Sequence, residues 1–237
     1  MAKRENPPRG LIFPPWIDQL TRLLGMVLAF GGVYVVLLVT FGASPRTTDV
    51  GYMPEQPVPY SHALHAGELG IDCRYCHTGV EVSAAAAIPP TQTCMNCHRK
   101  VLPDSVKLKP VVESYQTGVP VRWVRVHDLP DYVYFNHSAH VTRGVSCVSC
   151  HDRVDRMVEV YQAMPLSMGW CLQCHRDPAR ELRPRERVTD LGWGGERSGE
   201  ERTEAGRAIM RDLGLLDEQG HETERMELLT NCSTCHR

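Results

Sequence analysis

The segment Cys73-Arg74-Tyr75-Cys76-His77 and four further copies of its pattern, CxxCH, decide the fold of this chain. Numbered in chain order, motifs 1 to 5 occupy residues 73–77, 94–98, 147–151, 171–175 and 232–236. The chain of 237 residues has 10 cysteines, and the motifs contain all of them. A disulfide framework gives no reason for a histidine after each cysteine pair, and zinc bound by paired CxxC sequences does not need one either.

CxxCH is the attachment sequence of c-type haem, in which both cysteines bond the porphyrin edge and the histidine binds the iron. The sequence therefore predicts five covalently bound c-type haems. The predicted thioether residues are Cys73, Cys76, Cys94, Cys97, Cys147, Cys150, Cys171, Cys174, Cys232 and Cys235. The predicted proximal iron ligands are His77, His98, His151, His175 and His236.

An internal repeat supplies candidates for the distal iron ligands. Tyr60-Ser61-His62-Ala63-Leu64-His65 aligns with Phe135-Asn136-His137-Ser138-Ala139-His140, and each segment precedes a Gly-Ile/Val-x-Cys sequence. Histidines three residues apart share one face of a helix, so a pair can serve two neighbouring haems, or one member can bond a propionate. We predict His65 and His140 as distal ligands in their own halves of the chain, with His62 and His137 reaching across.

The fifth distal ligand has two candidates. His127 lies in an extended stretch before the second repeat, and Met168 lies three residues before Cys171. We favour His127, because a methionine at this position also serves well to pack against a haem edge. As a ligand, Met168 would raise the reduction potential of its haem. His221 lies among polar residues and is expected to be a bystander.

The number of candidate iron ligands bears on function, because it exceeds the number of axial positions on the five predicted haems. Haems with both axial positions filled transfer electrons and do little chemistry on small molecules. The sequence has no phosphate-binding loop, HExxH helix or GxSxG elbow. A formal net charge of −2 provides no basic field for nucleic acid. The sequence thus favours an electron-transfer protein without a catalytic residue of its own.

A membrane anchor is predicted near the N-terminus. Residues 23–43 carry no charge and are long enough to cross a bilayer core as one helix, with a lipid or a protein neighbour. The stretch exceeds the apolar core of a signal peptide, which favours an uncleaved anchor. Positive charges gather on the cytoplasmic side of membrane helices, and residues 1–22 carry Lys3, Arg4, Arg9 and Arg22. We therefore expect residues 1–22 to be a cytoplasmic N-terminal arm and the haem domain to lie on the periplasmic face of the inner membrane. Leu11, Ile12, Phe13 and Trp16 form an interfacial segment or a loose arm.

The predicted domain organisation follows from the motif positions. Residues 44–61 are a linker, and residues 62–237 form the haem domain, with haems 1–2 in 62–98, haems 3–4 in 135–175 and haem 5 in 232–236. About 35 residues per haem cannot bury a large side-chain core, so the haems themselves must supply it. We expect a mainly α fold with low regular structure, wrapped around haems in the manner of class III (c3-type) cytochromes. Residues 176–231 are a charged connector, either a solvated linker or a docking surface.

Three stretches resemble a known family, the membrane-anchored pentahaem cytochrome c subunit of alternative complex III. They are Gln92-Thr93-Cys94-Met95-Asn96-Cys97-His98, Val126-His127-Asp128-Leu129-Pro130-Asp131-Tyr132-Val133-Tyr134-Phe135-Asn136-His137 and Met168-Gly169-Trp170-Cys171-Leu172-Gln173-Cys174-His175-Arg176. The resemblance implies a subunit of a respiratory menaquinol:electron-acceptor oxidoreductase. The implied partners are an iron–sulfur subunit related to molybdopterin enzymes, multi-helix quinol-binding membrane subunits, and a monohaem cytochrome c or an oxidase as acceptor. The chain would relay electrons, and quinol would be oxidised on another subunit.

Two other functions remain open from the sequence. One is a self-sufficient membrane-anchored quinol dehydrogenase, which a Met-ligated or open haem near the membrane would favour. The other is a catalytic multihaem reductase of a nitrogen or sulfur oxyanion, which needs a haem with an open axial position.

Overall fold

The computed structural model describes residues 13–194 and 198–236, and they divide into an N-terminal unit ending at Thr48 and a second unit beginning at Asp49. Lys3, Arg4, Arg9, Leu11 and Ile12, on which the expected orientation and interfacial segment partly rest, lie outside the described residues. Across the described ranges the fold is mainly helical, with two isolated β-bridges and no strand. This confirms the predicted fold class.

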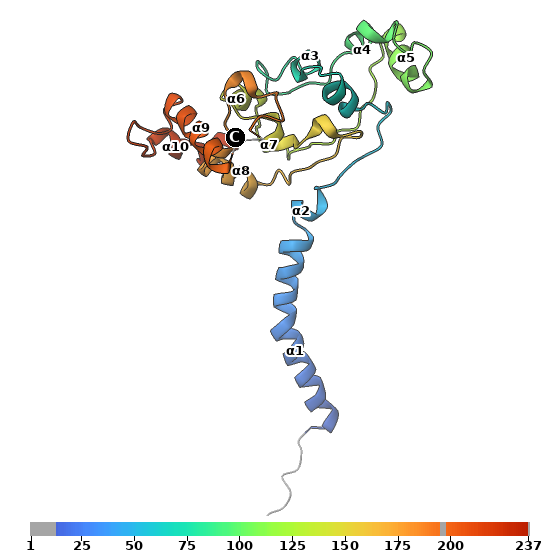
Figure 1. The fold of residues 1–237 in the computed structure, drawn as a ribbon. Coiled ribbons are helices and arrows are strands. Elements are labelled where there is room, and N and C mark those ends of the chain that lie inside the picture. Colours follow the sequence, from blue (N-terminus) through green and yellow to red (C-terminus); the bar gives the residue numbers. More distant parts are fainter. Residues whose placement is uncertain (1–12, 195–197, 237) are drawn as a thin grey trace, which may run out of the picture. The chain divides into compact units, whose positions relative to one another are not determined.

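The first unit is one long apolar helix with a short extension (Figure 1). It comprises α1 (Pro15–Leu37), the π-helical turn η1 (Leu38–Gly42) and α2 (Pro45–Thr48). Proline in the first turn suits a helix start, because the amide it lacks would have no partner there. The helix begins eight residues before the uncharged stretch of 23–43 and so includes Asp18 and Arg22.

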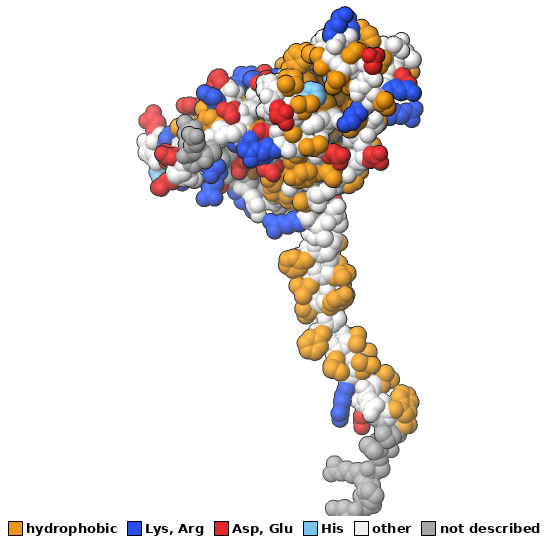
Figure 2. Space-filling view, turned by 45° about the vertical axis from the view of Figure 1, so that its right-hand side comes forward, with side chains coloured by type: hydrophobic (Ala, Val, Ile, Leu, Met, Phe, Trp, Pro, Cys, Tyr) orange, Lys and Arg blue, Asp and Glu red, His pale blue; other side chains and the backbone are white. Residues whose placement is uncertain are grey.

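By length and composition, residues Trp16–Gly42 form a helix able to cross a membrane, with a mean hydropathy of 2.4. Its side chains are exposed within the chain; Leu28 is 72% and Phe30 is 70% accessible. Figure 2 shows hydrophobic side chains along this helix on the visible face. A helix that is apolar all round needs an apolar environment, either lipid or other helices.

The second unit is a chain of short helices and turns (Figure 1). In order, they are η2 (Ala63–Glu68), α3 (Cys73–Cys76), α4 (Thr91–His98), η3 (Val106–Leu108), α5 (Lys109–Thr117), α6 (His137–Val141), α7 (Cys147–His151), η4 (Val154–Arg156), α8 (Met168–Arg176), η5 (Pro178–Arg180), η6 (Arg185–Arg187), α9 (Gly199–Asp212), α10 (Glu224–Leu229) and α11 (Cys232–Cys235). Each CxxCH motif lies on one of the short helices.

The side-chain core is divided into small clusters, as the ratio of residues to haems suggests. One contains Val58, Met95 and Val111 and joins α4 to α5, and another contains Val80, Val141 and Val188. The third contains Ala179, Leu182, Met210 and Met226. Clusters of this size leave the helices short of apolar burial, so a second source of stabilisation is needed.

The third cluster lies within residues 176–231, where the sequence suggested a solvated linker or a docking surface. Here α9 packs on η5, and Gly206 lies so close to the Ala179 carbonyl that a Cβ at this position would overlap it. Ser198 and Glu201 form a capping box that fixes the start of α9. This charged segment contains the amphipathic helix α9, whose apolar side contributes Met210 to a packed core.

Candidate haem-binding site

The CxxCH motifs are presented on single helical turns. Residues i, i+3 and i+4 of a helix lie on one face, so a single helical turn directs both cysteines and the histidine of a motif toward the same side. In motif 1 the His77 amide donates to the Cys73 carbonyl at 2.8 Å, and in motif 5 the His236 amide donates to Cys232 at 2.9 Å. Side chains cap these helices at the start: Asp72, Ser167 and Asn231 accept backbone amides of α3, α8 and α11.

All ten cysteines are free thiols rather than disulfides, which leaves them available for thioether bonds. Burial raises the pKa of Cys150 to about 12 and that of Cys174 to about 11. In the described parts of the chain, no three His, Cys, Asp or Glu side chains gather as they would around a directly bound metal ion.

The two copies of the repeat have the same local geometry. The Tyr60 ring stacks on His65 at 4.4 Å between centroids and meets His62 edge-on at 4.8 Å. Phe135 stacks on His140 at 4.6 Å and meets His137 edge-on at 4.8 Å. One aromatic side chain thus fixes two imidazoles. The sequence identified the repeat, but only the structure shows the part played by its aromatic residue.

The backbone differs between the copies but leads to the same junction with the next motif. His137 begins the α-helix α6, whereas His62 precedes the π-helical turn η2. In both copies the carbonyl of the second histidine accepts the amide two residues before the motif: Ile71 to His65 at 3.0 Å and Val145 to His140 at 3.1 Å. The glycine before that amide has a positive φ, +65° at Gly70 and +88° at Gly144, which explains its presence in both copies.

Three histidines of the repeat face a CxxCH histidine at similar separations. Ring centroids are 6.4 Å apart for His62 and His77, with an interplanar angle of 1°. They are 6.2 Å apart for His65 and His98 and 6.0 Å for His140 and His175. Two imidazoles on opposite sides of one metal, each with a metal–nitrogen bond of about 2 Å, have ring centres about 6 Å apart. The spacing therefore fits a single iron between the rings of each pair.

Most of these imidazoles are oriented by a backbone carbonyl. A hydrogen bond from Nδ1–H to a carbonyl leaves Nε2 as the free lone pair, which is the usual arrangement behind a metal-binding histidine. The recorded Nδ1 to oxygen distances run from 2.7 to 3.0 Å. The acceptors are Ser61 for His65, Ala87 for His77, Val101 for His98, Ala84 for His137, Asn136 for His140, Leu229 for His175 and Tyr132 for His236.

Burial favours the neutral form of His62 and His151. It lowers the pKa of His62 to about 4 and that of His151 to about 3, with the nearby imidazoles adding to the effect. A neutral imidazole is the form that binds a metal. Among the described residues the buried Nδ1 of His62 has no hydrogen-bond partner, and the ring packs edge-on against Tyr60.

His127 lies on the Nδ1 side of His151. The His127 Nε2 is 3.3 Å from the His151 Nδ1, and the centroids are only 4.4 Å apart at 81°. This separation is shorter than that of the three facing pairs and leaves no room for an iron between the two rings. The structure thus brings His127 to motif 3 behind its proximal histidine, not opposite it.

The remaining candidates lie in different settings. His62 faces motif 1 in its own half of the chain, in contrast to the expectation that it reaches across. His137 is near His127 and His151, since it contributes to lowering the pKa of both. Met168 begins α8 and is 62% exposed. His221 is exposed, and its Nδ1 lies 3.2 Å from Asp217 Oδ2.

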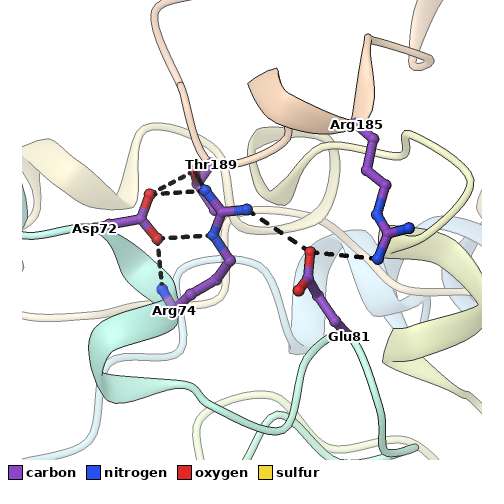
Figure 3. A network of polar contacts seen from close by, with 5 residues as sticks. All are labelled: Asp72, Arg74, Glu81, Arg185 and Thr189. Atoms are coloured by element: carbon purple, nitrogen blue, oxygen red, sulfur yellow. Dashed lines mark hydrogen bonds and ion pairs between the residues drawn. The ribbon is translucent and has the colours of Figure 1, made fainter.

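A polar network fastens motif 1 to the segment that supports motif 3 (Figure 3). Asp72 accepts from Thr189 Oγ1 at 2.9 Å and pairs with Arg74, which holds the pKa of Asp72 at about 2. Arg74 Nη1 and Arg185 Nη2 lie 3.7 and 3.9 Å from Glu81. The sequence did not identify these five residues as a network. Asp72 and Thr189 are more than a hundred positions apart in the chain, so no local pattern shows that they meet.

The chain is 32% identical over 151 residues to the multihaem cytochrome c subunit of a menaquinone reductase from Nitratidesulfovibrio vulgaris. The aligned part is 63% of this chain and 64% of that protein's length. No family model matches the chain. The chain is therefore similar to a multihaem cytochrome c subunit, and the similarity spans less than two thirds of that protein's length.

Proposed function

We propose that this chain is the electron-transfer subunit of a membrane-bound, menaquinone-linked oxidoreductase and that it binds five c-type haems. The observation that carries the proposal is the set of three facing histidine pairs, each joining a repeat histidine to a CxxCH histidine. The similarity to a menaquinone reductase subunit supports the link to a quinone.

We assign the iron ligands from these pairs. His62 and His77 hold haem 1, His65 and His98 hold haem 2, and His140 and His175 hold haem 4. The repeat then assigns His137 to haem 3 with His151, as the counterpart of His62 with His77. Haem 5 takes His236 as its proximal ligand.

When bound, each haem supplies one-electron oxidation and reduction at its iron. The chain's own residues hold the imidazoles in place, through Tyr60 and Phe135, and their carbonyl partners at Nδ1 leave Nε2 as the free lone pair. Because filled axial positions and bonded Nδ1 atoms change little between redox states, the site requires little rearrangement when an electron arrives or leaves. That property suits transfer rather than substrate chemistry.

The anchor and partners complete the proposal. We propose that the helix within 16–42 spans the inner membrane and that the haem domain lies on the periplasmic side, in a complex of the alternative complex III type. The proposed partners are an iron–sulfur/molybdopterin-family-like subunit, multi-helix quinol-binding subunits, and a monohaem cytochrome c or an oxidase. The direction of electron flow is a separate question, because the similar protein is named a menaquinone reductase, whereas alternative complex III oxidises menaquinol.

The test is to isolate the haem-staining particle from membranes in mild detergent and determine its subunits and the mass of this chain. The proposal expects a multi-subunit assembly, a chain mass increased by five haems, and menaquinol:cytochrome c activity. Menaquinone reduction by the same assembly would keep the electron-transfer role and reverse the direction. A lone chain that oxidises quinol would overturn the proposal in favour of a self-sufficient dehydrogenase.

A further inference from the structure

We propose that the five haems form one unbranched row in the spatial order 2–1–3–4–5, so that haems 2 and 5 are its two ends. The inference rests on the proposed function and adds what chain order does not give. Because electron tunnelling weakens steeply with the distance between porphyrin edges, the contacts between attachment motifs decide the route. Each junction of the row can be followed in the structure.

Motifs 2 and 1 meet through their own variable residues. Asn96 Nδ2, in motif 2, donates to the Tyr75 hydroxyl, in motif 1, at 3.1 Å. Each of these residues lies between the two cysteines of its motif, so this hydrogen bond brings the attachment cysteines of motifs 1 and 2 close together. Cysteines mark the edges of the porphyrins, so haems 1 and 2 are neighbours here.

Motifs 1 and 3 are clamped by residues 188 and 189. The Val188 carbonyl accepts from the Ser146 hydroxyl at 2.8 Å and from the Cys147 amide at 3.2 Å, at the start of motif 3. The next residue, Thr189, bonds Asp72 at the start of motif 1 (Figure 3). Cys73 directly follows Asp72 and Cys147 directly follows Ser146, so the same clamp brings the first cysteines of the two motifs close together.

Motifs 3 and 4 are joined by the chain on either side of them. Arg183, shortly after motif 4, donates its amide to Gly144, shortly before motif 3, at 2.8 Å. Leu182 and Val145 form a β-bridge at the same place.

Motifs 4 and 5 share the end of α10. The His175 Nδ1 donates to the Leu229 carbonyl at 2.7 Å, and the Thr234 hydroxyl in motif 5 donates to the Leu228 carbonyl at 2.6 Å. The pKa of Cys171 is raised by burial and by Cys235. Motif 5 thus lies next to motif 4.

These junctions give motif 1 two neighbours although it comes first in the chain, and they place motif 2 at an end. The haem 2 end is covered by α5, which packs on α4 through Val111 and Met95. The haem 5 end lies at α10 and α11. Redox partners on opposite sides of this subunit are therefore expected to meet these two ends.

The first test is the arrangement of the irons in the haem-loaded full-length chain, determined by cryo-electron microscopy within its complex. The proposal expects the four shortest iron–iron distances to be 2–1, 1–3, 3–4 and 4–5. A nearest neighbour of haem 2 other than haem 1, or a haem between 1 and 3, would overturn the order. A chain mass with fewer than five haems would instead count against the proposed function.

A second test asks whether the interior of the row is needed. In the loaded protein every native cysteine is a thioether, so Glu227→Cys gives one thiol, at the haem 5 end, for a ruthenium photoreductant. Trains of flashes are expected to reduce all five haems rapidly in this parent. The variant that lacks haem 2 (Cys94→Ala with Cys97→Ala) should still show rapid reduction of its four remaining haems. In the variant that lacks haem 3 (Cys147→Ala with Cys150→Ala), only haems 4 and 5 should be reduced rapidly. Rapid reduction of all the remaining haems in the last variant would refute the row, and if that variant does not accumulate, the iron distances decide.

Discussion

At the residue scale, the histidines of this protein differ in the group that their Nδ1 atom contacts. A carbonyl partner fixes the tautomer and aims Nε2, as in His77, His98 and His175. His151 differs because its Nδ1 meets another imidazole, and His62 differs because its Nδ1 has no partner. These differences allow the proposed ligands to be tested one side chain at a time.

The first prediction concerns His62. Replacing it with Ala removes the imidazole that faces His77, so one haem is expected to become high-spin while the other four stay low-spin. Absorption and electron paramagnetic resonance spectra of the oxidised protein measure this change. His221→Ala is the matched control, because His221 is exposed and bonds only Asp217 among the contacts recorded for it. An entirely low-spin His62→Ala protein would contradict the assignment.

The second prediction concerns His127. With the Nε2 of His151 on the iron, as proposed, its Nδ1 carries the proton and donates to the His127 Nε2 at 3.3 Å, and such a hydrogen bond makes the proximal imidazole a stronger donor to the iron. His127→Ala should therefore leave every haem low-spin but raise the reduction potential of haem 3. His127→Gln, which keeps an acceptor, should recover part of the shift. Spectropotentiometry measures the potentials, and a high-spin signal in His127→Ala would show that this residue is an iron ligand instead.

At the element scale, the packing of α9 on η5 depends on the absence of a side chain at Gly206. A methyl group there would overlap the Ala179 carbonyl. Overpacking of this kind costs roughly 1–3 kcal/mol, and contact with backbone puts Gly206→Ala at about 3 kcal/mol. Guanidinium unfolding of the haem-loaded chain, followed by circular dichroism, gives the free energy.

Gly199→Ala is the control for that variant, because a Cβ at Gly199 in the same helix meets nothing within 4 Å. It should change the free energy of unfolding by less than about 1 kcal/mol, in the stabilising direction expected of alanine in a helix. Equal effects of both alanines would mean that helix propensity, not contact with Ala179, limits this region.

The start of α3 supports a further prediction at this scale. Asp72→Ala removes the helix cap and the acceptor of Thr189, and should cost about 1–2 kcal/mol. Asp72→Asn keeps the cap and should cost less. Arg74 lowers the pKa of Asp72 from its ordinary 3.8 to about 2, so its ionic contribution is present above pH 3.8 and is lost as the pH falls toward 2. Unfolding curves between pH 2 and 7 should converge for Asp72→Asn and the parent at the acidic end.

At the scale of the whole molecule, the described chain consists of an apolar helix and a haem-binding unit that require different surroundings. Within the described part of the first unit the helix leaves its apolar side chains exposed, and the described residues of the second unit form only small side-chain clusters. Lipid or other subunits would cover the first, and haems would complete the second. Stability of the whole is therefore expected to depend on what it binds.

The last prediction follows from the exposed helix. Phe30→Arg combined with Val33→Arg places two charges near its middle, and each arginine at a bilayer centre costs about 2.5–3.5 kcal/mol on the insertion scale. The variant should move to the supernatant on alkaline carbonate extraction, whereas Phe30→Leu with Val33→Leu should stay in the membrane fraction. Retention of both variants would show that the haem unit or a partner subunit, rather than this helix, holds the chain to the membrane.

The sequence alone determined the features that depend on short stretches of chain. Haem attachment is predicted from five residues in a row, and the repeat and the apolar helix can be recognised from local periodicity, so these predictions needed no contact between distant residues. The tertiary structure decided which repeat histidine faces which motif, the place of His127 behind His151, and the contacts from motif 2 through 1, 3 and 4 to 5. Those features depend on bonds between residues far apart, such as Ser146 with Val188 and Asp72 with Thr189. Each such bond contributes only about 1 kcal/mol, so the arrangement arises from their sum across the fold and leaves no pattern in any single segment.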